Sequence, residues 1–192
     1  MKGIAVFTNR NALVLACFAF LTKSAFAAPT LDEVCDMTTC RPETSISVRI
    51  SKDQASEINL LKAPYYFQNT ANVVSGETIF LEATVVAGKI EDLKYVKSNI
   101  NPDNTIVMTL TAIEDDPSKI STMLQITNPL SEALTYKAMF HSASTSKFQK
   151  TTTCPVPAKG SSYESWAFPI FQMALMSFNL VSETEAESRG CI

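Results

Sequence analysis

Short stretches of alternating apolar and polar residues recur along the chain at roughly ten-residue intervals. In the stretch 44–50, for example, Ile46, Val48 and Ile50 alternate with polar residues. A period of two places alternate side chains on one face of a β-strand, so this pattern predicts a strand with one buried face. A period of two also predicts strands over 78–86, 90–96, 105–113, 119–128 and 133–141. The run 63–67 is short and aromatic with proline near its start, which suits an edge strand or the start of a strand.

Turn residues separate these stretches, as in Ser75-Gly76-Glu77 and Asn128-Pro129. About eight short strands joined by turns predict an all-β protein with an antiparallel β-sandwich and little helix. We expect 142–153 to be a long loop running into a short strand, 155–165 to be loop, and 183–189 to be an acidic tail.

The stretch 168–181 is apolar on both faces. Pro169 and the flanking turns favour a strand over a helix, although the spacing alone fits either. One interpretation is a central segment covered on both sides. The other is a docking surface for a partner or a second copy of the chain. The residues proposed for that surface are Trp166, Phe168, Phe171, Met173 and Phe178.

The first 27 residues have the pattern of a cleavable export signal. Lys2 and Arg10 precede a ten-residue apolar run over 12–21, and Ala25-Phe26-Ala27 has the small residues that a signal peptidase accepts. We therefore expect a signal peptide over 1–27, a disulfide-bearing segment over 28–43 and a β-sandwich over 44–192. The predicted location is the periplasm or the exterior of the cell.

Cys17 offers an alternative, because Val14-Leu15-Ala16-Cys17 loosely matches a bacterial lipidation motif. The apolar run continues beyond Cys17, however, and leaves too short an apolar segment before it. We therefore expect no lipid anchor.

Four cysteines follow the predicted signal: Cys35, Cys40, Cys154 and Cys191. An even number in an exported chain predicts two disulfides, for which three pairings are possible. We favour Cys35–Cys40 and Cys154–Cys191. The spacing C-x4-C differs from the C-x-x-C of thiol redox sites, and the set lacks the close pairs of a zinc ribbon.

Composition and charge narrow the classes of partner. The chain has 192 residues, 46% of them hydrophobic, and a formal net charge of −3. The predicted signal holds Lys2, Arg10 and Lys23 and no acidic residue, so the remainder is more acidic still. An acidic chain without a basic block argues against nucleic acid as a partner. No second apolar run is long enough to span a membrane.

Candidate chemistry is sparse. His141 is the single histidine, and it has no nucleophile motif around it. Met139 and His141 share a strand face and are weak candidates for a copper site, to which Met108, Met123, Met173 or Met176 could add thioethers. The run Glu114-Asp115-Asp116 could act in a hydrolase, although its composition is that of a solvated turn. We therefore expect no catalytic residue and no cofactor.

Two groups of residues carry a resemblance to known families. The strand Leu124–Thr127, the turn Asn128-Pro129 and the strand Leu134–Ala138 resemble a pair found in bacterial immunoglobulin-like envelope domains, including periplasmic pilus chaperones. Cys40-Arg41-Pro42, the run 93–97 and Cys154-Pro155 resemble small exported proteobacterial proteins without an assigned function. The resemblance implies an immunoglobulin-like sandwich in the cell envelope.

Together, these observations predict a non-enzymatic periplasmic or secreted module for binding or assembly, with a protein partner or a second copy. The alternatives are an envelope protein that handles copper and an unrecognised hydrolase.

Overall fold

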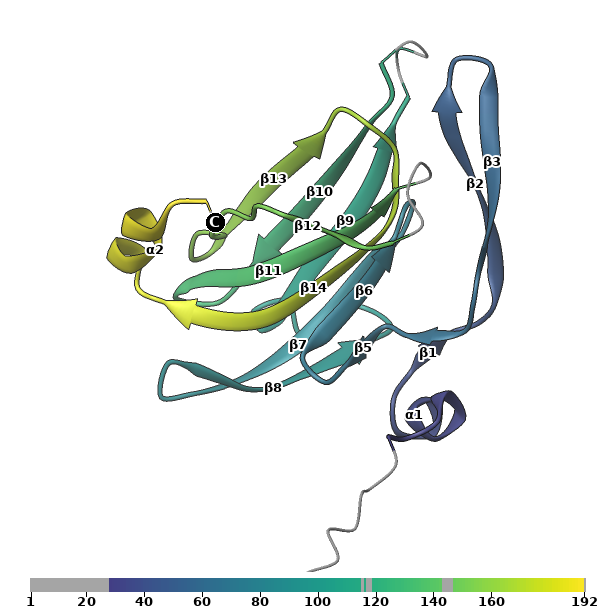
Figure 1. The fold of residues 1–192 in the computed structure, drawn as a ribbon. Coiled ribbons are helices and arrows are strands. Elements are labelled where there is room, and N and C mark those ends of the chain that lie inside the picture. The colour runs from purple at the N-terminus through teal and green to yellow at the C-terminus, as the bar shows by residue number, and fades with distance from the viewer. Residues whose placement is uncertain (1–27, 115, 117–118, 143–146, 192) are drawn as a thin grey trace, which may run out of the picture.

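Two antiparallel five-stranded sheets pack face to face (Figure 1). The structure is a computed structural model that describes residues 28–114, 116, 119–142 and 147–191. The predicted signal over 1–27, with Cys17, lies outside the described residues. The predicted β-sandwich is confirmed, whereas its immunoglobulin-like topology stays a prediction.

The first sheet contains the strands predicted over 78–128 and one that was not predicted. Its strands are β7 (Thr78–Val86), β8 (Lys89–Val96), β9 (Thr105–Ile113), β10 (Ser121–Asn128) and β13 (Gly160–Trp166). Their spatial order is β13–β10–β9–β7–β8. Each hairpin neighbour pairs antiparallel, as short turns require.

The second sheet is built around the last long strand of the chain. Its strands are β5 (Tyr66–Phe67), β6 (Thr70–Val74), β11 (Ala133–Ser142), β12 (Gln149–Thr151) and β14 (Ile170–Val181). Their order is β12–β11–β14–β6–β5. Strand β14 thus pairs with β11 on one side and β6 on the other, and its inward side chains, such as Met173 and Leu175, belong to the main core.

The core lies between the two sheets and follows the predicted alternation. In β10, for example, Thr122, Leu124 and Ile126 are buried, whereas Met123 and Gln125 between them are half-exposed. The largest fully buried side chains are Val73, Ile79, Leu81, Ile106, Met108, Leu110, Leu124, Ile126, Leu134, Ile170, Met173 and Leu175.

The turn at Asn128-Pro129 carries the chain from the first sheet to the second. Asn128 is fully buried, and its Nδ2 donates hydrogen bonds to the carbonyls of Glu132 (2.9 Å) and Pro157 (3.1 Å). Its Oδ1 accepts a hydrogen bond from the backbone N–H of Leu130 (3.0 Å). One amide side chain therefore satisfies polar backbone groups that the crossing would otherwise leave buried and unpaired.

Strand β13 corrects the prediction that 155–165 is loop. All seven of its residues pair with β10, from Gly160 opposite Asn128 to Trp166 opposite Thr122. Its inward positions include Ser162 and Glu164, so the strand lacks the apolar alternation by which the other strands were predicted.

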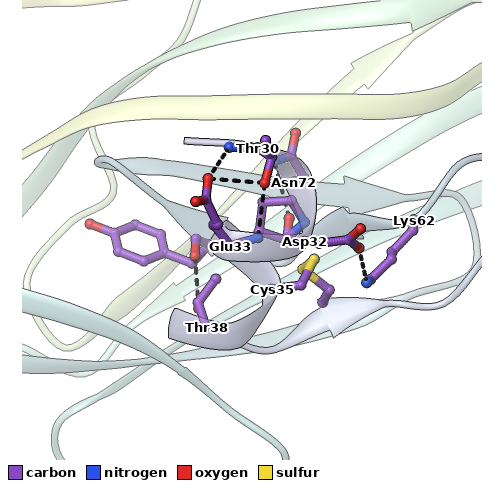
Figure 2. Close-up of a disulfide and its surroundings, with 10 residues drawn as sticks. Thr30, Asp32, Glu33, Cys35, Thr38, Lys62 and Asn72 are labelled. Carbon is purple, nitrogen blue, oxygen red and sulfur yellow. Dashed lines mark hydrogen bonds and ion pairs between the residues drawn. A yellow bond between two sulfur atoms is a disulfide. The ribbon is translucent and has the colours of Figure 1, made fainter. Parts of the chain in front are cut away.

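Helix α1 (Leu31–Met37) precedes the sandwich and was not predicted. Thr30 Oγ1 accepts a hydrogen bond from the backbone N–H of Glu33, and the Glu33 carboxylate accepts one from the backbone N–H of Thr30 (2.7 Å). These hydrogen bonds form a capping box and lower the pKa of Glu33. The disulfide Cys35–Cys40 joins the helix to β1 (Cys40–Arg41), as Figure 2 shows around Cys35.

Helix α2 (Glu183–Arg189) replaces the acidic tail expected there. Ser182 caps it by accepting a hydrogen bond from the backbone N–H of Glu185. Ala186 packs against Ala133 and Val181. The disulfide Cys154–Cys191 holds the chain just beyond this helix. Both predicted cysteine pairings are therefore confirmed.

Candidate partner-binding site

A separate β-hairpin stands beside the sandwich (Figure 1, right). It consists of β2 (Thr44–Ser51) and β3 (Gln54–Leu60). At its base, β1 pairs with β4 (Ala63–Pro64), so the chain enters and leaves the hairpin through adjacent strands. Only the first half of this hairpin was predicted, because polar residues interrupt the apolar alternation in β3.

The hairpin contacts the sandwich through a small apolar cluster of its own. Val48 and Leu60 pack against Val74 and Phe171, and all four side chains are at most 7% exposed. This cluster is separate from the main core. The hairpin is therefore attached to the sandwich by far fewer apolar contacts than those that join the two sheets.

Near its tip, the hairpin forms an exposed ion pair with the end of the first sheet. Arg49 Nε lies 3.0 Å from Glu114 Oε2, with the two side chains 42% and 39% exposed. A pair this exposed contributes at most about 1 kcal/mol. Asp116, from the same predicted acidic turn, lies 3.9 Å from Lys119, and Asp115 lies outside the described residues. Glu114 thus serves as a contact to the hairpin.

The base of the hairpin is held much more firmly. Arg41 is only 3% exposed and donates hydrogen bonds to both carboxylate oxygens of Glu77 (2.6 and 2.5 Å) and to the carbonyl of Asn72 (3.1 Å). Its guanidinium lies 5.0 Å from the ring centre of Tyr65, which stacks on Tyr95 at 4.2 Å. Burial, with Tyr65 and Glu77 nearby, raises the pKa of Tyr95.

Between the hairpin tip and the sandwich lies a groove of about 620 Å³, which we call the tip groove. Its walls come from three segments that are distant in sequence. Phe168 contributes a side chain that is 37% exposed, and lysines stand on both sides. The lining residues are Ile50, Ser51, Lys52, Lys119, Ile120, Ser121, Ala167, Phe168 and Pro169.

The five residues predicted as a partner surface lie in different places. Phe168 lines the tip groove, and Phe171 is covered by the hairpin. Trp166 is half-buried, and its Nε1 donates a hydrogen bond to Thr151 Oγ1 (3.0 Å). Met173 and Phe178 are in the core, 0% and 4% exposed. The expectation of one surface is therefore wrong for Met173 and Phe178, which the first sheet covers.

The two weak metal candidates line different grooves on the outer side of the second sheet. His141 borders a groove of about 300 Å³ beside the hairpin base, where its ring lies 4.5 Å from that of Phe171 and 5.2 Å from that of Phe148. Met139 borders a groove of about 330 Å³ with Met176.

The methionines predicted to complete a copper site are dispersed. Met108 and Met173 are in the core. Met123 is half-exposed and lies on the outer face of the first sheet, opposite to the face that its buried neighbours in β10 occupy. Only Met176 shares a sheet face with Met139 and His141. In the described part of the chain, no three His, Cys, Asp or Glu side chains gather in a way that could hold a metal ion.

A polar cluster that sequence reasoning missed joins the two sheets at one side. Tyr136 of β11 donates a hydrogen bond to Glu164 Oε1 of β13 (2.6 Å), and the same oxygen accepts one from the backbone N–H of Cys154 (2.9 Å). Burial and the Glu164 carboxylate raise the pKa of Tyr136. The Glu164 carboxylate thus points toward the second sheet.

Comparisons of the chain with protein-family models, with curated proteins and with solved structures found no match. Neither α1 nor α2, the helices of the described residues, has the length and apolar character needed to cross a membrane.

Proposed function

We propose that the protein is a non-enzymatic binding or assembly module, exported to the periplasm or secreted, whose immunoglobulin-like sandwich presents the tip groove to a protein partner. Its two disulfides support an oxidising compartment. The observation that carries the proposal is the groove itself, a hollow of about 620 Å³ beside a hairpin that a small apolar cluster and, near its tip, an exposed ion pair join to the sandwich.

The attachment of the hairpin suits it to close on a partner. Its base is fixed by the buried Arg41–Glu77 pair, whereas its tip is restrained by the exposed Arg49–Glu114 pair. Small movements of the tip would therefore change the width of the groove at low energetic cost, which allows one wall to adjust to what binds.

The lining of the groove indicates the chemistry of the partner. Ile50, Ile120 and Phe168 offer apolar surface, while Lys52 and Lys119 bring positive charge to the two walls. The side chain of Lys119 is 82% exposed, and its Nζ lies 3.9 Å from Asp116 Oδ2. An extended peptide segment with apolar side chains and an acidic residue complements this arrangement.

Site-specific photo-crosslinking in intact cells tests the proposal. A photoreactive residue at Phe168 should give a discrete adduct with a partner. The same residue at Ile100, which is 87% exposed and does not line the groove, should not. Equal adduct patterns at the two positions, or no adduct at Phe168, would contradict the proposal.

A charge reversal tests the chemistry of the partner. Lys52→Glu should lower the yield of the Phe168 adduct several-fold, because it places a negative charge beside the expected acidic residue. Lys137→Glu makes the same change on an exposed side chain of β11, away from the groove, and should leave the yield unchanged. Equal losses for both variants would show only a general charge effect.

A further inference from the structure

The outer edges of the two sheets differ in how they are protected against pairing with another chain. An edge strand has unpaired backbone groups, and natural proteins block such edges with short strands, charges, prolines or bulges. In the second sheet, the edge strands β5 and β12 have two and three residues. In the first sheet, β8 carries Lys89, Glu91, Asp92 and Lys94, and its register with β7 is interrupted by a bulge.

Strand β13 has fewer of these protections than β8, because a single charged residue, Glu164, is its one such feature. Its seven residues pair with β10 without a register shift, and it contains no lysine, arginine or proline. Its single charge, on Glu164, is directed toward Tyr136 in the second sheet. Within the described residues, β10 is the sole strand neighbour of β13. The backbone on its other side is therefore available for a further strand.

We propose that a second copy of the chain pairs antiparallel with β13 across a two-fold axis, joining the two first sheets into one continuous sheet. A two-fold axis perpendicular to the sheet leaves the inner faces of both copies on the same side of the joined sheet. Residues that oppose each other across the axis must then point to the same face, and because faces alternate along a strand their sequence numbers differ by an even number. If all seven residues 160–166 of one copy pair with the same seven of the other, Gly160 opposes Trp166 and the axis passes through the middle residue, Tyr163.

In this register the two copies complement each other. Tyr163 faces Tyr163, Ser161 faces Ser165, and Ser162 faces Glu164, so no like charges oppose each other. Tyr163 is 62% exposed on the outer face. Its ring would gain an aromatic cross-strand neighbour, and this pair type stabilises sheets. An interface of this small size is weak, with an expected Kd of about 1 μM to 1 mM.

Charge exchange at position 163 tests both the pairing and its axis. Sedimentation equilibrium of the disulfide-bonded chain over about 10 μM to 1 mM should show a monomer–dimer equilibrium. Tyr163→Lys and Tyr163→Glu should each be monomeric alone, because a two-fold axis puts like charges face to face. An equimolar mixture should form a mixed dimer. Ile100→Lys introduces the same positive charge at an exposed site outside β13, and this variant should associate like the unchanged chain.

Several results would overturn the proposal. They are a monomeric unchanged chain over the whole range, dimers of Tyr163→Lys alone, or a mixture that fails to pair. Unaltered thermal unfolding of the variants shows that they fold, as expected for a side chain whose hydrogen bond is to the exposed amide of Gln125. Residues 160–166 do not line the tip groove, and an adduct at Phe168 with a protein other than this chain therefore tests the proposed function separately.

Discussion

Replacing Arg41 by methionine tests whether a buried ion pair holds the base of the hairpin. Methionine retains a long apolar side chain against Tyr65 but removes the guanidinium. The variant loses two charged hydrogen bonds to Glu77, at 2.6 and 2.5 Å, and one to the carbonyl of Asn72. Glu77 then remains as a carboxylate without its cation.

The expected loss of stability depends on how far the Glu77 carboxylate is exposed to water. Breaking a fully buried pair by removing one partner costs about 3–5 kcal/mol. The Glu77 side chain is 23% exposed and still accepts a hydrogen bond from the backbone N–H of Val74 (3.1 Å). Partial hydration therefore reduces the loss, and we expect Arg41→Met to lower the free energy of unfolding by about 2–4 kcal/mol.

Urea unfolding with both disulfides intact measures this loss. Arg49→Met is the matched control, because it breaks the exposed pair at the tip and should cost at most about 1 kcal/mol. In a double-mutant cycle, Arg41→Met with Glu77→Gln should cost less than the sum of the single changes by about 1–3 kcal/mol. Equal losses for Arg41→Met and Arg49→Met, or strictly additive losses in the cycle, would refute this account of the base.

Three further changes probe the fold that supports the groove. Asn128→Asp should lower the free energy of unfolding by about 3 kcal/mol at neutral pH, because a carboxylate would face two carbonyls that now accept hydrogen bonds from the Asn128 amide. A loss below about 1 kcal/mol in urea unfolding would contradict the role of this amide in holding the turn. Met173→Ala should cost about 2–5 kcal/mol by leaving a cavity between the sheets, against less than about 1 kcal/mol for Met123→Ala on the outer face. Replacing both Cys154 and Cys191, which are 37 positions apart, by serine should lower the free energy of unfolding by about 4 kcal/mol. The same replacement of Cys35 and Cys40, which are 5 positions apart, should lower it by about 2 kcal/mol. Calorimetry that ranks the two disulfides in the opposite order would contradict the loop-length argument.

The strands of the sandwich could be predicted where buried and exposed positions alternate and the residue types alternate with them. In β10, alternate residues enter one core, and the alternation predicted the strand directly. Strand β13 was missed because its inward positions are stabilised from the opposite sheet. Glu164 accepts from Tyr136, and Trp166 donates to Thr151. Residues far along the chain provide these partners, so no local pattern reveals the strand.

The helices were missed for a different reason. A helix of seven residues spans about two turns, which is too short for its apolar period to stand out. The capping box of Thr30 and Glu33 was the available signal. The corresponding signal for α2 was Ser182 three residues before Glu185.

The candidate site was only partly accessible to sequence reasoning. Phe168 was named as a partner residue, and it lines the tip groove. Met173 and Phe178 were named with it although they are buried, because an apolar stretch does not show which of its faces another sheet covers. The groove itself depends on the position of the hairpin relative to 119–121 and 167–169, and this position is a tertiary property.

The pairing of β1 with β4 has a consequence for how this protein can change. Arg41 and Ala63 are directly opposite each other, so everything between them leaves the fold and returns at one point. Opposing residues of an antiparallel pair are only about 5 Å apart, and a short turn can join them. The hairpin is thus an insertion whose length and exposed residues can vary without re-routing the strands of the sandwich, while Val48 and Leu60 keep their contacts with Val74 and Phe171. Loops with adjacent ends readily accept such variation, and new binding specificities could arise in this segment while the two sheets stay as they are.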